Sequence, residues 1–185
     1  MAKNKGKVFE DAFKASLPGH CLLIRIPDPP HSWDREGSST RFAPKNPCDF
    51  VMFDSNARIQ YCLELKSTKA KSMSFDDVSL NYSEGKMVKQ HQIKALTGFA
   101  KFPYVRAGFL FNFRDEANNE ERTYYQDIVS FNNMVSKIGK KSFNEKDLGL
   151  HNAIVVDGKI KRVKYTWDIE GLLGKLDDVY EKCLN

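Results

Sequence analysis

Two acidic residues and a lysine lie where two short apolar segments of the sequence would bring them together. The segments are residues 48–54 and 59–66, and four residues separate them. If the residues that flank this short connection pair in an antiparallel hairpin, Asp49 lies directly opposite Glu64. Opposed residues point to the same face of a sheet, with Cβ atoms about 4.5 to 5.5 Å apart. Strand alternation places Lys66 on that face as well. The pattern therefore predicts two carboxylates and one ammonium group at one end of a strand pair.

Such a cluster has a definite chemistry. Two like charges at this separation repel each other unless a cation or a shared proton lies between them. Mg²⁺ takes one or two carboxylates and keeps waters for a substrate phosphate, and the main-chain carbonyl of Leu65 is a candidate third ligand. Lys66 would orient or deprotonate a water, or stabilise the charge that builds on phosphorus. The alternative is an Asp–Glu–Lys network on a half-exposed strand, with no catalytic role.

Length and composition fit one soluble domain. The chain has 185 residues, of which 41% are hydrophobic and 29% charged, so it is long enough for a core and is not a disordered or low-complexity protein. No apolar run approaches the roughly 18 residues of a membrane span, and no signal peptide precedes residue 8. We therefore expect a cytoplasmic protein, one domain over residues 1–185, without membrane contact. The absence of a glycine-rich phosphate loop argues against a nucleotide cofactor.

Charge and cysteine usage narrow the class of partner. The net charge is +5, and lysines gather near the N-terminus, after residue 65 and around residue 160, which favours a polyanion such as nucleic acid. An ordinary solvated surface would look similar. The four cysteines and four histidines are dispersed, and this spacing predicts free thiols rather than a zinc site.

The hydrophobic pattern predicts an α/β fold, a single domain with a mixed β-sheet flanked by helices. Helices are expected at 5–17, 86–100 and, as an amphipathic C-terminal helix, 168–183, with a short helix starting near 130. Strands are expected at 21–26, 48–54, 59–66, 105–113, 122–128 and 152–156.

An irregular excursion is predicted between the first two strands. Residues 27–47 contain five prolines, which resist both helix and strand pairing, among basic and aromatic residues. Long loops of this kind are usually functional. Its basic residues could clamp phosphates, or they could form an ordinary basic loop. The residues predicted to contact DNA are Arg35, Arg41 and Lys45 in this excursion, with Lys69 and Lys71 just after the second acidic strand.

Asp49, followed after fourteen residues by Glu64-Leu65-Lys66, resembles the PD-(D/E)xK nuclease superfamily, whose fold is restriction-endonuclease-like. Two further residues fit this resemblance. Glu10 lies at the border of the apolar stripe of the first helix, where many of these nucleases carry an acid. Gln92 interrupts the apolar face of the second helix, and a helical glutamine supports the site in this superfamily.

More narrowly, the chain resembles RecU-type Holliday-junction resolvases. The matching pieces are Gly6-Lys7-Val8-Phe9-Glu10, Ser39-Thr40, Glu64-Leu65-Lys66-Ser67-Thr68 with Ser74-Phe75, and His91-Gln92-Ile93. This resemblance implies a homodimer that cuts four-way DNA junctions with paired nicks, and residues 27–47 would be a short version of the family's stalk. A compact, phage-encoded member would fit.

The resemblance also implies roles for single residues. Asp49 and Glu64, with the Leu65 carbonyl, would hold Mg²⁺ or Mn²⁺. Glu10 would assist through a metal-bound water, Lys66 would act on the nucleophilic water, and Gln92 would orient its neighbours. Two alternatives remain at this stage. One is another nuclease of the same superfamily, such as a restriction, nicking or exonuclease, and the other is a non-catalytic DNA- or RNA-binding module.

Overall fold

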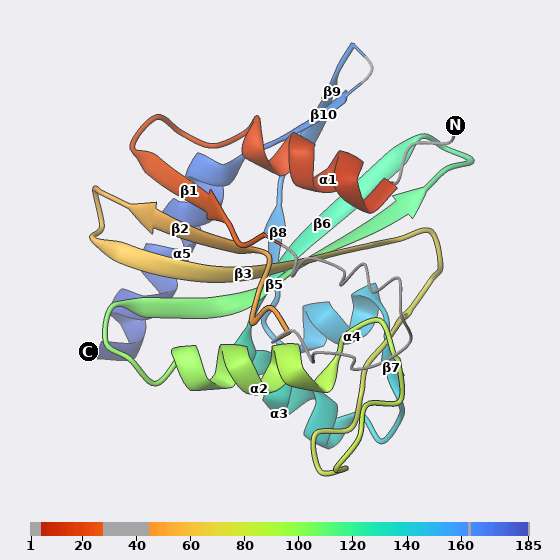
Figure 1. The fold of residues 1–185 in the computed structure, drawn as a ribbon. Helices are drawn as coiled ribbons and strands as arrows, with labels where there is room; N and C mark the ends of the chain where they lie inside the picture. The colour runs from red at the N-terminus through yellow and green to blue at the C-terminus, as the bar shows by residue number, and fades with distance from the viewer. Residues whose placement is uncertain (1–4, 28–44, 163, 185) are drawn as a thin grey trace, which may run out of the picture.

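A six-stranded mixed β-sheet forms the centre of the structure, a computed structural model that describes residues 5–27, 45–162 and 164–184 (Figure 1). Its strand order is β1-β2-β3-β5-β6-β8, and only β3 and β5 pair in parallel within this sheet. The α/β class with a mixed sheet flanked by helices is thereby confirmed. The strands are β1 (Cys21–Arg25), β2 (Phe50–Asp54), β3 (Ile59–Thr68), β5 (Val105–Asp115), β6 (Glu120–Asp127) and β8 (Ile154–Val156).

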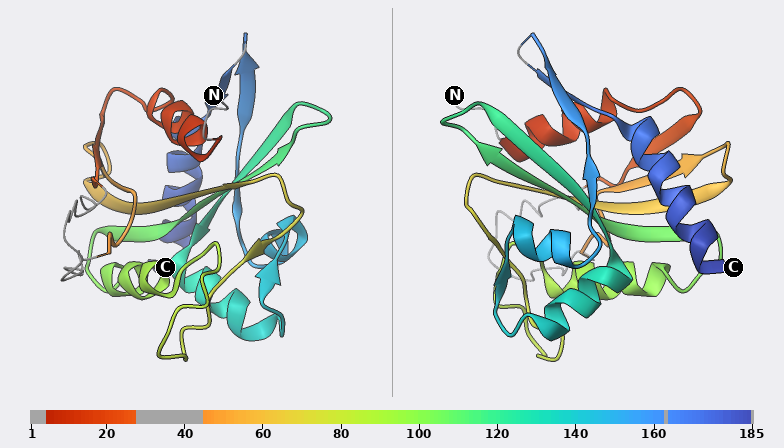
Figure 2. Two further views of the ribbon diagram at one scale, coloured as in Figure 1. Left: turned by 45° about the vertical axis from the view of Figure 1, so that its right-hand side comes forward. Right: turned by 180° about the vertical axis from the view of Figure 1, so that it is seen from behind.

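Helices cover both faces of this sheet (Figure 2). The helices α1 (Lys5–Lys14) and α5 (Ile169–Leu184) pack on one face, and α2 (Gln90–Phe99), α3 (Ile128–Lys137) and α4 (Glu145–Leu150) pack on the other. Each face has its own apolar core. Both central strands are buried on both sides over a stretch of mostly apolar residues, 61–65 in β3 and 106–113 in β5. The C-terminal helix expected at 168–183 is confirmed, with Ile169, Leu172, Leu173 and Leu176 buried.

Two small sheets were not predicted. One joins β4 (Met73–Ser74) to β7 (Ser142–Phe143), and the other is the hairpin of β9 (Gly158–Lys161) and β10 (Lys164–Trp167). In this hairpin a Cβ atom on Gly158 would lie 2.4 Å from the Trp167 ring, so the position tolerates only glycine. The basic residues of the hairpin, Lys159, Lys161 and Lys164, are exposed.

The second predicted helix starts later than its apolar spacing indicates. The expectation was a helix over 86–100, but α2 begins at Gln90. The preceding segment is extended, because Val88 forms a parallel bridge with Phe75 and donates its N–H to the Ser74 carbonyl at 2.9 Å. Val88 is buried, as expected, but it reaches the core from this extended segment and not from the face of a helix.

Most of the predicted excursion, from residue 28 to residue 44, lies outside the described residues. Within the described part of the chain, Cys21, Cys48 and Cys62 are free thiols. No helix of that part is long and apolar enough to cross a membrane.

Candidate active site

The predicted pairing of the two acidic segments is confirmed in its register. Phe50 pairs with Leu63 and Asp54 with Ile59, which places Asp49 at the start of β2 across from Glu64 on β3. Leu65 donates its main-chain N–H to Asp49 Oδ2 at 2.8 Å. The carboxylate thus takes the place of a main-chain carbonyl from the neighbouring strand. This bond fixes the Asp49 carboxylate beside the strand that carries Glu64.

Glu64 is the buried centre of the cluster, with 2% of its surface exposed. Its Oε1 atom accepts a hydrogen bond from Lys66 Nζ at 2.6 Å and a second one from Gln92 Nε2. The Lys66 side chain remains 16% exposed, so its ammonium group is reachable from solvent. The structure therefore brings together Asp49, Glu64, Lys66 and Gln92, as the sequence predicted.

The amide of Gln92 is oriented by its own helix. Gln92 Oε1 accepts the main-chain N–H of Lys89 at 3.0 Å, which is half of a capping box at the start of α2. With its oxygen occupied there, the amide turns its NH₂ group toward Glu64. The beginning of α2 is therefore coupled to the carboxylate on β3.

Burial disfavours the charged forms of both acids. Burial raises the pKa of Glu64 to about 7; the Asp49 charge adds to this rise, and Lys66 opposes it. Burial also raises the pKa of Asp49, against the hydrogen bond from Leu65 and the charges of Lys66 and Arg25. One lysine thus does not fully compensate the two carboxylates. Oxygen donors with an excess of negative charge suit a hard divalent ion such as Mg²⁺ or Mn²⁺.

Leu65 fits the place of a third donor. In a strand, the N–H and C=O of one residue point toward the same neighbouring strand. The Leu65 N–H points to Asp49, so its carbonyl lies on the same side, next to the start of β2. That position is consistent with the predicted ligand set of two carboxylates and one main-chain carbonyl.

Glu10 is only indirectly linked to this cluster. It lies on α1, which covers the opposite face of the sheet from α2, and its Oε2 accepts a hydrogen bond from Arg25 Nε at 3.3 Å. The Arg25 charge in turn lowers the pKa of Asp49. Within the described residues, the acid predicted to assist the site is therefore held by an arginine between it and Asp49.

Comparisons with known proteins find a relative in sequence and similar solved structures, and no family model matches the chain. The SPbeta prophage-derived uncharacterized protein YotM of Bacillus subtilis (strain 168) is 30% identical over 184 residues, which cover 95% of this chain and 88% of YotM. The chain belongs to the YotM family. The solved structure of the Holliday junction resolvase Hjc from Archaeoglobus fulgidus is similar over 79% of this chain and 89% of that chain, with 14% identity and a TM-score of 0.43.

The predicted DNA contacts of this YotM-family chain are only partly described. Arg35 and Arg41 lie outside the described residues. Lys45, Lys69 and Lys71 are exposed. Lys69 and Lys71 border a cavity of about 570 Å³ beyond the end of β3, whose wall also includes Arg114, Arg122 and Lys146. Glu116 and Glu145 line it too, so the cavity is mixed in charge with a basic majority.

Asp76 is a positioning residue that sequence analysis missed. It is 1% exposed and accepts hydrogen bonds from the Ser83 hydroxyl and from the main-chain N–H groups of Glu84, Lys86 and Gln90. Burial opposes its ionisation, but these hydrogen bonds together lower its pKa below the ordinary value. Asp76 thereby holds together the loop that leads into α2. This loop fixes the position of the first turn of α2, which contains Gln92. An Asp after a short apolar segment was its only signal in the sequence.

His91, next to Gln92 in the first turn of α2, is half-buried. Its Nδ1 atom is buried and has no hydrogen-bond partner among the described residues. Burial and the nearby charges of Lys45, Lys89 and Lys66 lower its pKa, so the imidazole is neutral near pH 7. His91 therefore belongs to the surroundings of Lys66.

Proposed function

We propose that this protein is a metal-dependent endonuclease of the restriction-endonuclease-like type that hydrolyses phosphodiester bonds in branched DNA. The observation that carries the proposal is the arrangement of Asp49, Glu64 and Lys66 at one strand end, with Gln92 bonded to Glu64. The raised pKa of Glu64 supports it, because functional sites hold carboxylates whose charge is balanced only when a ligand binds.

The proposed roles are those that the resemblance to PD-(D/E)xK nucleases implies, and the geometry supports them. Asp49, Glu64 and the Leu65 carbonyl would hold Mg²⁺ or Mn²⁺. When bound, such an ion supplies charge neutralisation at the scissile phosphate and a more acidic water. Lys66 Nζ, next to Glu64 and partly exposed, would orient the attacking water or stabilise charge on the phosphate oxygens. Gln92 holds Glu64 in one position, and Glu10 would act through Arg25 on the Asp49 side of the site.

The substrate would lie across the exposed lysines at the end of β3. Lys69 and Lys71 follow directly on the strand that carries Glu64 and Lys66, so a phosphate backbone leaving the site can reach them. Lys45 lies on the other side, with His91, and Arg35 and Arg41 belong to the same proposed footprint. The mixed charge of the cavity suits a backbone contact more than a deep anion pocket.

Four-way junctions are the proposed substrate, cut with paired nicks by a homodimer. This finer step is supported by the sequence resemblance to RecU-type resolvases, including the position of residues 27–47 where that family carries a stalk. The prophage origin of YotM agrees with a phage-encoded enzyme of recombination or repair. A restriction, nicking or exonuclease of the same fold is the second candidate, because the site chemistry would be the same.

The test uses the full chain with an end-labelled four-way junction and a matched linear duplex, each with Mg²⁺, Mn²⁺ or EDTA. We expect symmetric nicks in the junction alone, only with metal. Glu64→Gln and Lys66→Ala should each lower the cleavage rate by at least about a hundredfold while DNA binding remains. Lys101→Ala, an exposed lysine at the far end of α2, is the matched control and should cut normally.

Other outcomes of this assay would change the proposed function. Equal cutting of junction and duplex would remove the junction preference and leave the nuclease. If the protein binds DNA without metal, does not cut it, and binds equally well as Glu64→Gln, then it is a DNA- or RNA-binding module and not a nuclease. Light scattering of the protein with and without junction DNA measures the homodimer separately.

A further inference from the structure

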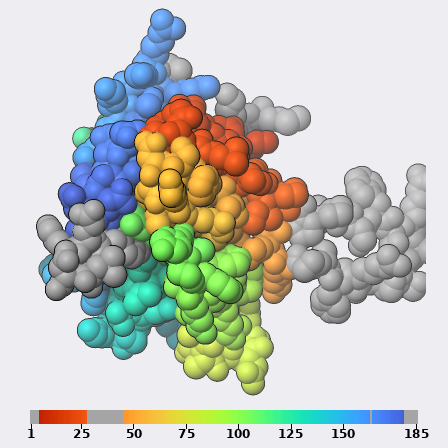
Figure 3. Space-filling view, turned by 90° about the vertical axis from the view of Figure 1, so that its left-hand side faces the viewer, coloured from red at the N-terminus to blue at the C-terminus, as the bar shows by residue number. Residues whose placement is uncertain are grey.

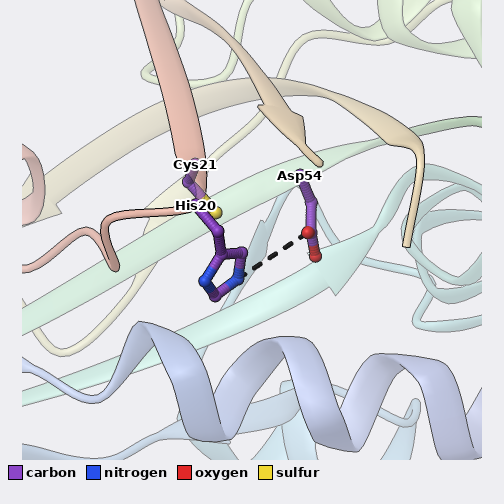
Figure 4. Close-up of side chains that lie close together, drawn as sticks. All are labelled: His20, Cys21 and Asp54. Carbon is purple, nitrogen blue, oxygen red and sulfur yellow. Dashed lines mark ion pairs between the residues drawn. The ribbon is translucent and has the colours of Figure 1, made fainter. Parts of the chain in front are cut away.

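A second cluster of metal-binding side chains lies at the opposite end of the same strands. Cys21 begins β1 and Asp54 ends β2, and the two are register partners in the antiparallel pair. Cross-strand partners point to the same face, about 4.5 to 5.5 Å apart at Cβ. His20 directly precedes Cys21, and one ligand atom each of His20, Cys21 and Asp54 lies within 4.8 Å of the other two (Figure 4).

The main chain holds these three residues in place without any ion. The His20 carbonyl accepts both the N–H and the hydroxyl of Ser55, at 3.2 and 2.9 Å, so the residue before β1 is tied to the residue after β2. Asp54 is 2% exposed, and its Oδ1 atom accepts the N–H groups of Asn56 and Ala57. The carboxylate is therefore fixed by its turn, and Oδ2 is its oxygen available to a ligand within the described part of the chain.

The imidazole of His20 points into this cluster from the side of α5. Its Nε2 atom is 3.7 Å from Asp54 Oδ1, and its Nδ1 atom is 3.9 Å from Glu170 Oε2 in the first turn of α5. Both distances exceed a direct hydrogen bond. Figure 3 looks onto this end of the molecule, where the α1–β1 connection, the β2–β3 turn and α5 meet at the surface. The His20 side chain is 22% exposed, so solvent reaches the cluster from its side.

We propose that His20, Cys21 and Asp54 bind a zinc ion, with a water in the fourth position. One nitrogen, one sulfur and one carboxylate oxygen are a donor set that Zn²⁺ accepts in tetrahedral geometry. Mg²⁺ and Ca²⁺ prefer oxygen donors alone and are disfavoured by the thiolate. The separation of the donor atoms in the structure matches a site in which an ion would sit between them rather than a set of direct contacts.

This zinc site is distinct from the proposed catalytic site. The whole length of β2, about 16 Å for five residues, separates Asp54 from Asp49. A zinc ion at this end would cross-link the β1–β2 pair. Its expected role is structural, so its loss would lower thermal stability and leave the chemistry of the Asp49–Glu64 cluster in place.

The experiment measures metal binding in the Glu64→Gln background, which disables the other candidate site. Co²⁺ is the spectroscopic probe, because a thiolate ligand gives Co²⁺ an intense charge-transfer band in the near ultraviolet, and Zn²⁺ then displaces it. We expect one Co²⁺ per chain with this band. His20→Ala and Cys21→Ser should each weaken Zn²⁺ binding by more than about tenfold, since even residues that only support a ligand cost that much.

Matched controls separate this site from the cysteines near the active site. Cys62, two residues before Glu64, and His151 should be replaceable by Ala without loss of the band. Asp54→Asn keeps the Oδ1 acceptor of the turn but removes the ligand oxygen, so it should fold and still lose affinity. Zn²⁺ should raise the melting temperature of the Glu64→Gln protein and not that of these ligand variants.

Two results would overturn the proposal. If Co²⁺ gives no thiolate band, or if the band is lost in Cys62→Ala instead of Cys21→Ser, the ion does not bind here. If Zn²⁺ changes neither the spectrum nor the melting temperature, the cluster holds no metal, and His20 only lies between the carboxylates of Asp54 and Glu170. Neither result would affect the nuclease proposal, which the cleavage assay tests separately.

Discussion

Gln92 on α2 donates a hydrogen bond from Nε2 to Glu64 Oε1 on β3, while its own Oε1 accepts the N–H of Lys89. Through this one amide, the first turn of a helix and the buried acid of the sheet are held in a fixed relation. The proposed metal ligand therefore depends on where α2 starts, and that start depends on the loop closed by Asp76.

The first prediction concerns this link. Gln92→Ala removes the donor that orients Glu64 and should lower cleavage by about ten- to a hundredfold, as loss of a group supporting a metal ligand does. Metal affinity should fall with it, which calorimetry with Mn²⁺ can measure. The matched control is Gln60→Ala, an exposed glutamine on the same β3 strand. Normal Mn²⁺ affinity in Gln92→Ala would show that Glu64 does not need the amide.

The second prediction is a dependence of metal binding on pH. Glu64, with its pKa raised to about 7, is largely protonated below that pH and must lose its proton before it can hold a cation. Affinity for Mn²⁺ should therefore rise with pH up to about 7 and level off above it, with about one proton released per ion at low pH. Calorimetry in buffers of different ionisation enthalpy counts that proton. A flat affinity between pH 5 and 8 would contradict the buried site.

The third prediction is the effect of the same group on metal-free stability. The pKa of Glu64 is higher in the folded protein than its ordinary value of 4.5, so the folded state binds more protons between pH 4.5 and 7. The free energy of unfolding should therefore fall as pH rises through this window, by up to about 3 kcal/mol. In Glu64→Gln the free energy of unfolding should not fall in this way. The variant should be more stable than the natural protein at pH 8 in EDTA, and about equally stable at pH 5. Urea denaturation at both pH values measures the difference.

The fourth prediction concerns Asp76. Asp76→Ala leaves the N–H groups of Glu84, Lys86 and Gln90 without their acceptor and should lower the free energy of unfolding by about 2 to 4 kcal/mol. Its exposed neighbour offers a matched control. Within the described residues the Asp77 carboxylate accepts hydrogen bonds from the N–H and hydroxyl of Ser79 alone, so Asp77→Ala should cost much less. Similar losses in both variants would mean that Asp76 does not organise the loop.

The strand pair at the proposed active site could be predicted because short turns fix register. Once Asp54 pairs with Ile59, every later pair follows, and a slip of one residue would turn Glu64 away from Asp49. The apolar runs of β3 and β5 likewise predicted these two strands, but not their burial on both faces. The spacing of residues was sufficient to predict the pairing of strands that are joined by a short turn.

Other features depend on contacts that spacing does not encode. Val88 has the spacing of a helix residue, but its pairing with Phe75 keeps it extended. His20 and Asp54 are separated by more than thirty residues and meet only because β1 pairs with β2, which no motif in the sequence specifies. Glu10 lies on the helix that the sequence predicted, but its partner Arg25 belongs to β1, and no spacing in the sequence links the two.

The last prediction concerns the DNA footprint beyond the end of β3. Lys69 and Lys71 are exposed there, on the walls of the cavity next to Arg114 and Arg122. If each lysine neutralises one phosphate, each replacement by Ala should weaken junction binding and lower the slope of log affinity against log salt by about 1. Binding is measured by fluorescence anisotropy in Ca²⁺ at several salt concentrations, with Glu64→Gln protein so that no cutting occurs.

A matched control distinguishes this footprint from general charge. Lys137→Ala, at the exposed end of α3, removes the same charge far from the cavity and should leave the salt slope unchanged. Equal losses in Lys137→Ala and in the two cavity variants would mean that the net charge of +5, and not this surface, attracts the DNA. An unchanged slope in Lys69→Ala and Lys71→Ala would move the backbone contact away from the end of β3. The DNA would then leave the site on the side of Lys45 and His91.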